Sequence, residues 1–256
     1  MPRLARAIVP GLPHHVTQRG NRRQTTFFCN EDYLLYMSLM AASCRRFGVE
    51  IWAYCLMPNH AHLIAVPSTA DGLRRAIGDA HQRYTARINA ARAWRGYLWQ
   101  GRFSSFVMDE RYTLAAARYV ELNPVRAQLV SRPEDYAWSS ARAHLHGRDD
   151  ALVTVAPLLR RMPEWREFLG AAQADEADQI QRHANTGRPL GTEEFVTEVE
   201  RLLGRVLRRR KPGPVPAPSA AVTSPQVAEF CSVSPDLPRS SVRNGRLCSG
   251  RPCGPR

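Results

Sequence analysis

The feature that most constrains the fold is a pair of apolar segments separated by the dipeptide Pro58-Asn59. Val49–Met57 is rich in β-branched and aromatic residues, and His60–Val66 is again largely apolar. Two such segments on either side of a short Pro-Asn turn predict a β-hairpin whose strands are antiparallel. The chain must therefore contain a sheet that includes this hairpin.

Other predicted elements lie on both sides of the hairpin. A strand over His14–Arg19 ends at Gly20-Asn21, and a helix follows from Asn30, as its N-cap, to about Phe47. After the hairpin come a helix over about 71–92, a strand over about 101–108 and a helix from about 112 to 123, ahead of Pro124. This β-α-β-β-α-β-α order predicts an α+β fold, a ferredoxin-like antiparallel sheet with helices on one face.

Composition divides the 256 residues into three parts. Residues 1–150 are typical of a globular domain. Residues 151–211 are predicted to be a helical extension that ends in the basic run Arg208-Arg209-Arg210-Lys211. Residues 212–256 contain nine of the 19 prolines and many serines. A segment of that composition cannot bury a core, so we expect a disordered tail.

The net charge of +13 indicates a polyanionic partner, and all but one of the 36 basic residues are arginines. Nucleic acid is the favoured partner, and an acidic lipid surface is the alternative. No apolar run is long enough for a transmembrane helix, and the first residues do not resemble a signal peptide. The six cysteines form no CxxC pair, so we expect a reducing, cytoplasmic location and no membrane partner.

His60-Ala61-His62 begins the second strand of the hairpin. Residues i and i+2 of a strand share one face, so the two imidazoles would lie together and suit one metal ion. The alternative is a pair of partly buried histidines that bond only to the backbone. A second His-x-His, His144-Leu145-His146, precedes the polar turn Gly147–Asp150 and is interpreted as a structural or surface pair.

The helix before Pro124 carries two polar residues at positions i and i+4, Tyr119 and Asn123, which share one face. Tyr112, Ala115 and Ala116 fall on the same arc, while Arg118 and Glu121 point away. The small alanines would leave space beside the two polar side chains. Alternatively, Tyr119 is a core tyrosine and Asn123 caps the end of the helix.

Several segments resemble the HUH single-tyrosine transposases, and most closely their REP-associated branch. The strings that carry the resemblance, in chain order, are 15–24 (HVTQRGNRRQ), 54–63 (YCLMPNHAHL), 98–103 (LWQGRF), 118–127 (RYVELNPVRA), 133–140 (PEDYAWSS) and 186–191 (TGRPLG). The resemblance covers about residues 1–211 and implies the HUH endonuclease fold.

The resemblance also implies a role for each matched residue. His60 and His62 would bind Mg²⁺ or Mn²⁺, with Asn123 as a third ligand, and Tyr119 would be the nucleophile. The implied reaction is cleavage of single-stranded DNA beside a hairpin through a 5′-phosphotyrosine, followed by rejoining, as in DNA transposition. The protein would be a monomer or a homodimer and would act at the bacterial nucleoid. The alternative function is hairpin binding without catalysis.

Ten arginines are candidates for DNA binding, although each alone is more often part of a solvated surface. They are Arg19, Arg22 and Arg23 after the first strand; Arg74, Arg75, Arg83 and Arg87 on the second helix; and Arg102, Arg126 and Arg188 in the segments that carry the resemblance. Four aromatic residues could stack on unpaired bases: Trp52, Tyr54, Trp99 and Phe103. For Trp52 and Tyr54, packing in the core is the favoured role.

Overall fold

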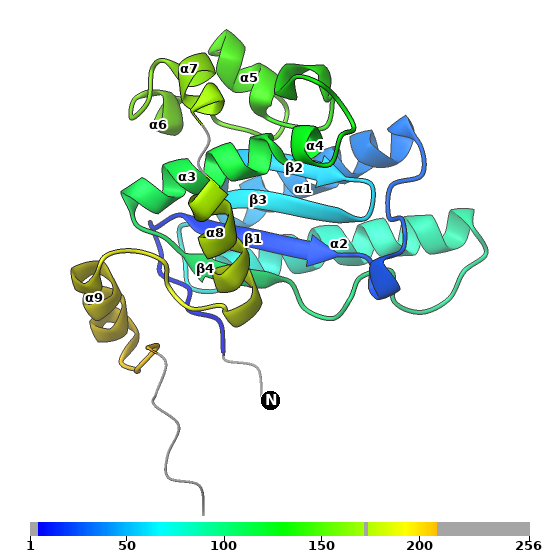
Figure 1. Cartoon of the computed structure of the whole chain (residues 1–256). Helices are drawn as coiled ribbons and strands as arrows, with labels where there is room; N and C mark the ends of the chain where they lie inside the picture. Colours follow the sequence, from blue (N-terminus) through cyan, green and yellow to red (C-terminus); the bar gives the residue numbers. More distant parts are fainter. Residues whose placement is uncertain (1–4, 172–173, 209–256) are drawn as a thin grey trace, which may run out of the picture. The chain divides into compact units, whose positions relative to one another are not determined.

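Four strands form one antiparallel sheet in the computed structural model, which describes residues 5–171 and 174–208. Its order is β2-β3-β1-β4, with the hairpin strands next to each other (Figure 1). The strands are β1 (His14–Arg19), β2 (Val49–Met57), β3 (His60–Pro67) and β4 (Ser104–Val107). The predicted α+β class and ferredoxin-like order are confirmed, and the predicted disordered tail, 212–256, lies outside the described residues.

One face of the sheet is covered by α1 (Asn30–Phe47) and α2 (Gly72–Ala91). Alternate residues of β3, among them Ala61 and Leu63, point into this layer. There they pack with Met40 of α1 and Ile77 of α2, all of them at most 2% exposed. The larger of the two sheet cores therefore lies on the side of Ala61 and not on the side of the two flanking histidines.

The other face carries α3 (Glu110–Glu121) and α8 (Ala174–Thr186), so the expectation of helices on one face is wrong in this respect (Figure 1). The physical reason lies in β2 and β4, whose opposite-facing residues are also apolar. Cys55 and Phe106 are fully buried there against Ala116 of α3. A sheet that is apolar on both faces must be covered on both.

The chain after α3 is largely helical, as predicted for 151–211 over the part that is described. Besides α8, its helices are α4 (Asn123–Arg126), η2 (Pro133–Asp135), α5 (Ala141–His146), α6 (Ala156–Leu159), α7 (Trp165–Gly170) and α9 (Glu193–Leu203). A short helical turn, η1 (Asn21–Arg23), follows β1 earlier in the chain. Val199 of α9 packs with Val9 and Val107, which links α9 to β4. The division at residue 150 stays a prediction. No helix in the described ranges is long and apolar enough to cross a membrane.

Two predicted helix ends differ from the structure. Asn30 is the first helical residue of α1, and Cys29 occupies the N-cap position. The carboxylate of Asp32, in the first turn, accepts a hydrogen bond from the Phe28 N–H at 2.9 Å. The third helix ends at Glu121, and the chain then makes a further short helix, α4, from Asn123. Pro124 occupies the first turn of α4, where its missing N–H breaks no helical hydrogen bond.

Candidate active site

His60 and His62 project from the same face of β3, as the strand periodicity predicts. Their rings are 4.9 Å apart between centroids and nearly perpendicular. On β1 they stand opposite Arg19 and Thr17, respectively. His62 is only 6% exposed, and His60 is half-buried. The pair therefore lies at the boundary between the sheet and an adjoining cavity.

Each of the two histidines uses Nδ1 for a hydrogen bond inside the protein. Nδ1 of His60 is 2.6 Å from Oδ1 of Asn59, and Nδ1 of His62 is 3.1 Å from Nε2 of His15. Neither Nε2 has a hydrogen-bond partner among the described residues. In the tautomer that carries the proton on Nδ1, the Nε2 lone pair of each imidazole is available to a cation.

Tyr119 and Asn123 reach the same space from α3 and the start of α4. The Tyr119 ring is 5.8 Å from the ring of His62, and its hydroxyl donates to Oε1 of Gln181 at 3.2 Å. Nδ2 of Asn123 is buried and has no hydrogen-bond partner in the described part of the chain. The guanidinium of Arg126 lies over the Tyr119 ring, 4.0 Å from its centroid. A positive charge therefore lies against the face of the phenol ring.

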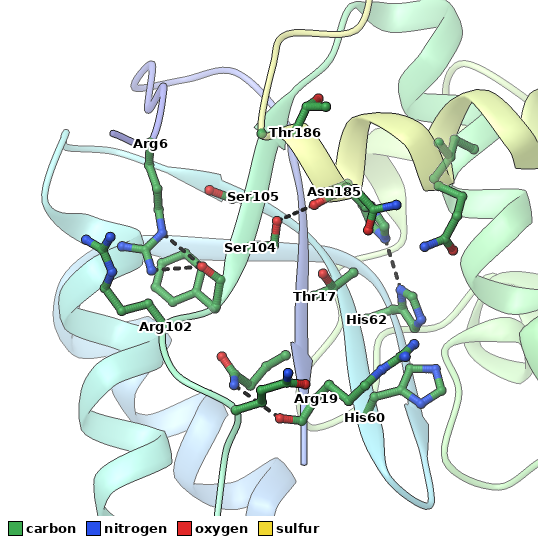
Figure 2. A pocket seen from close by; sticks show the side chains of 18 of the residues that line it. Arg6, Thr17, Arg19, His60, His62, Arg102, Ser104, Ser105, Asn185 and Thr186 are labelled. Carbon is green, nitrogen blue, oxygen red and sulfur yellow. Dashed lines mark hydrogen bonds between the residues drawn. The ribbon is translucent and has the colours of Figure 1, made fainter. Parts of the chain in front are cut away.

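These residues open onto a cavity of about 840 Å³. Figure 2 shows His60 and His62 at one end and Arg6 and Arg102 at the other, with β1 between them. Among residues 5–171 and 174–208, four arginines and no carboxylate line the cavity: Arg6, Arg19, Arg102 and Arg188. Four buried polar atoms in its lining have no hydrogen-bond partner within the same ranges: His15 Nδ1, Gln18 Oε1, Ser105 Oγ and Asn123 Nδ2. Such atoms are rare in folded proteins, so the lining is suited to a polar, anionic ligand.

Burial keeps the histidines of the cavity neutral. It lowers the pKa of His15 to about 3, and together with the charge of Arg19 it lowers the pKa of His60 to about 4. Burial and the neighbouring imidazoles hold the pKa of His62 well below its usual range. Neutral imidazoles are the form that binds metal ions.

The donor set fits a divalent cation. It comprises the two Nε2 atoms and the side-chain amide of Asn123. The buried Nδ2 of Asn123 forms no hydrogen bond within the described ranges, so the amide can rotate by 180° and direct its oxygen toward a cation. Within the described ranges no cluster of three or more His, Cys, Asp or Glu side chains could hold a metal ion. A cation at His60 and His62 would complete its shell from the amide, water or substrate oxygens, and by ligand softness two imidazoles and an amide suit zinc or cobalt as well as Mg²⁺ or Mn²⁺.

Comparison with known proteins identifies the domain that carries this cavity. Residues 9–123 match the family model described as "Transposase IS200 like". These residues form an IS200-like transposase domain. They include β1 to β4, α3, Tyr119 and all three candidate ligands, whereas Arg126, Gln181 and Arg188 lie beyond the matched region.

Two relatives extend the comparison beyond the IS200-like domain. A Haemophilus influenzae protein named "Putative REP-associated tyrosine transposase" is 24% identical over 136 residues, which are 49% of this chain and 75% of that protein. A solved structure of a REP-associated tyrosine transposase bound to a REP hairpin covers 60% of this chain and 92% of its own, with 20% identity and a TM-score of 0.50. That level of likeness shows a shared fold.

The second His-x-His of the chain lies outside the cavity. It is on helix α5, where His144 is buried and His146 is exposed. Nδ1 of His144 is 2.6 Å from Oε1 of Glu121, a fully buried carboxylate that also accepts from Ser140 and Trp165. As predicted, Glu121 points away from Tyr119. His144 thus has a structural role between α3 and α5.

The ten candidate arginines fall into separate groups. Arg19, Arg102 and Arg188 line the cavity, and Arg126 covers Tyr119. Arg22 and Arg23 are exposed in η1. The four arginines on α2 are exposed and do not line the cavity. Arg74 pairs with Asp71, and Arg83 pairs with Asp79. Arg75 lies over the Phe47 ring, and Arg87 has no ion pair among the described residues. The structure therefore brings only some of them to the IS200-like site.

Three residues of the site were not predicted from the sequence. His15 appeared only as part of a strand, yet it holds His62. Gln181 and Arg6 reach the cavity from α8 and the N-terminal segment, outside the segments that carry the resemblance. Conversely, Trp99 is not available for a base, because it is buried and stacked on His81 with centroids 4.6 Å apart. Trp52 and Tyr54 are core residues, as favoured.

Proposed function

We propose that this chain is a metal-dependent transposase that nicks single-stranded DNA beside a hairpin and transfers the cut strand through Tyr119. The observation that carries the proposal is one cavity that joins the Tyr119 hydroxyl, the two Nε2 atoms of His60 and His62, and the arginines Arg19, Arg102 and Arg188. A tyrosine nucleophile, a cation site and a phosphate-binding surface are the parts that this reaction needs.

In the proposed reaction the Tyr119 oxygen attacks the scissile phosphorus. A bond forms between that oxygen and phosphorus, and the bond from phosphorus to the 3′ oxygen breaks. The products are a 5′-phosphotyrosine and a 3′-hydroxyl; the phenol proton leaves to water, and the 3′ oxygen takes up a proton. Because one phosphodiester is exchanged for another, a second 3′-hydroxyl can reverse the reaction on a new strand without a nucleotide cofactor.

The residues around Tyr119 have distinct tasks. The Arg126 guanidinium against the ring stabilises negative charge as it develops on the phenol oxygen. Arg19, Arg102 and Arg188 bind phosphates of the strand in the cavity. His15 is a positioning residue, since its contact with Nδ1 of His62 orients that ring. Bound at His60, His62 and Asn123, Mg²⁺ or Mn²⁺ would neutralise charge on a non-bridging oxygen of the scissile phosphate.

The hairpin part of the proposal is supported by the solved relative, which is bound to a REP hairpin. The catalytic domain of the proposal spans 1–150, with 151–211 as a basic helical extension. Acting on chromosomal DNA, the protein would work in the bacterial cytoplasm as a monomer or homodimer.

The test is incubation of the full chain with end-labelled single-stranded DNA that contains a REP-like hairpin, in Mg²⁺ or Mn²⁺. We expect a covalent adduct that survives denaturation with the wild type and none with Tyr119→Phe, which removes one hydroxyl and little volume. Tyr112→Phe, on the same helix, is the matched control and should form the adduct. If the wild type binds the hairpin but never forms an adduct, the protein is instead a non-catalytic hairpin binder.

A further inference from the structure

The loop that leads from α2 to β4 displays two aromatic side chains to solvent. Trp94 is 42% exposed and Tyr97 is 88% exposed. Every other Phe, Tyr and Trp in residues 5–171 and 174–208 is buried or half-buried. A ring as exposed as that of Tyr97 contributes little to folding, whereas the Trp94 ring also packs edge-on against Phe28, with centroids 5.6 Å apart. Two exposed aromatic side chains three residues apart in one loop indicate a binding surface.

Arginines surround these two rings. Arg92 and Arg95 belong to the same loop, and Arg22 and Arg23 belong to η1. The two segments lie side by side, because the Asn21 N–H donates to the Leu98 carbonyl at 2.8 Å. We call this set the loop surface: Arg22, Arg23, Arg92, Trp94, Arg95 and Tyr97.

The arginines of the loop surface differ from two of the arginines on α2. None of the four forms an ion pair with any residue in the described ranges, whereas Arg74 and Arg83 on α2 both pair with aspartates. Arg92 lies over the Phe28 ring, 3.6 Å from its centroid. The loop surface therefore offers positive charge and exposed rings together, a combination that complements phosphates and unpaired bases.

The loop surface is continuous with the His60 end of the cavity. The side-chain amide of Asn59 donates to the Arg23 carbonyl at 3.1 Å, and its oxygen contacts His60. From the loop side, the Gln100 N–H donates to the Arg19 carbonyl at 2.8 Å, and both residues line the cavity. A strand that leaves the cavity at this end meets the loop surface directly.

We propose that the loop surface binds unpaired bases of the DNA strand that occupies the cavity. The rings of Tyr97 and Trp94 stack on bases, and the four arginines contact the neighbouring phosphates. Bases within a duplex already stack on each other, so this surface selects single-stranded DNA over paired DNA. The inference rests on the proposed function because it concerns the same DNA strand.

The experiment compares binding of the full chain to oligo(dT) and to a blunt duplex of the same length. We expect Tyr97→Ala to weaken binding of oligo(dT) by about 5- to 100-fold, the loss of one base stacked on an aromatic ring. Tyr97→Phe keeps the ring and should bind as the wild type does. Leu34→Ala, which trims a 59% exposed side chain on α1, is the control and should change nothing. Binding of the duplex should stay the same in all variants.

Three results would overturn the inference. The first is that Tyr97→Ala binds oligo(dT) as tightly as the wild type, and the second is that it loses as much affinity for the duplex as for oligo(dT). The third is that it binds DNA normally but has half the wild-type mass in light scattering, which would assign the surface to a second copy of the chain. Failure of the proposed function gives a different result, since that would appear as the absence of a covalent adduct while the Tyr97→Ala defect in oligo(dT) binding persists.

Discussion

The chain contains two His-x-His segments that the fold uses in opposite ways. In His60-Ala61-His62, on a strand, both rings lie on one face and line a basic cavity. In His144-Leu145-His146, on a helix, the two side chains diverge, and the buried one bonds to a buried carboxylate. Residues two apart are on one side of a strand but about 200° apart around a helix. The same spacing therefore gives a ligand pair only in the strand.

The largest expected effect separates the two segments by activity. His62→Ala removes an imidazole from the cavity and should lower metal-dependent cleavage about 100-fold or more, since metal stabilisation of the phosphate contributes several kcal/mol. His146→Ala, a change at the exposed member of the helical pair, should leave the cleavage rate unchanged. The rate is measured with labelled single-stranded DNA in Mn²⁺, and equal losses in the two variants would abolish the distinction.

A second difference should appear in stability. His144→Ala deletes a buried ring and leaves the Glu121 carboxylate short of one donor, so it should reduce the free energy of unfolding by about 2–4 kcal/mol. His146→Ala should change it by less than about 0.5 kcal/mol. Urea unfolding followed by circular dichroism measures both. A His144→Ala protein as stable as the wild type would show that the network does not hold α3 and α5 together.

The smallest effect concerns pH and two buried, neutral histidines of β1, of which His15 lines the cavity and His14 does not. The folded-state pKa values of His15 and His14 are about 3 and about 4, against 6.5 in an unfolded chain. Below pH 6.5 the unfolded chain takes up protons that the folded chain does not, so stability falls as pH falls. Each of these histidines should contribute about 1.4 kcal/mol per pH unit between 6.5 and its folded pKa.

Urea unfolding of the metal-free protein between pH 7 and pH 5 measures this slope of unfolding free energy against pH. The His15→Phe variant, provided that it folds, should have a shallower slope. An unchanged slope in that variant would mean that His15 is not held neutral by the fold. The contribution is fully present above pH 6.5, where neither state is protonated at these rings.

The local sequence pattern predicted the hairpin and the positions of His60 and His62, because strand periodicity and the Pro58-Asn59 turn act within a few residues. It placed Tyr119 and Asn123 beside each other for the same reason. It could not reveal Gln181, which reaches the Tyr119 hydroxyl from α8 through packing across 62 positions of sequence. Nor could it reveal that His15 bonds to His62, since that depends on the pairing of β1 with β3.

Helix boundaries failed where two short-range preferences compete. Asn30 and Asp32 both suit the start of α1, and the structure uses Asp32 because its carboxylate reaches the Phe28 N–H. Pro124 stops α3 as predicted, but it also begins a new short helix. The aromatic residues that are exposed, Trp94 and Tyr97, lie in a segment with no periodic pattern, so only the fold distinguishes them from the buried Trp99.

The central claim is that the residue that attacks DNA is the tyrosine facing the His60–His62 cavity. Its most direct test is peptide mapping by mass spectrometry of the adduct formed with single-stranded hairpin DNA and Mn²⁺. The account predicts a nucleotide 5′-phosphate on the peptide that contains Tyr119, and no such mass with His62→Ala. A modified peptide from any other part of the chain, or an adduct at Tyr119 that forms equally well in His62→Ala, would contradict it.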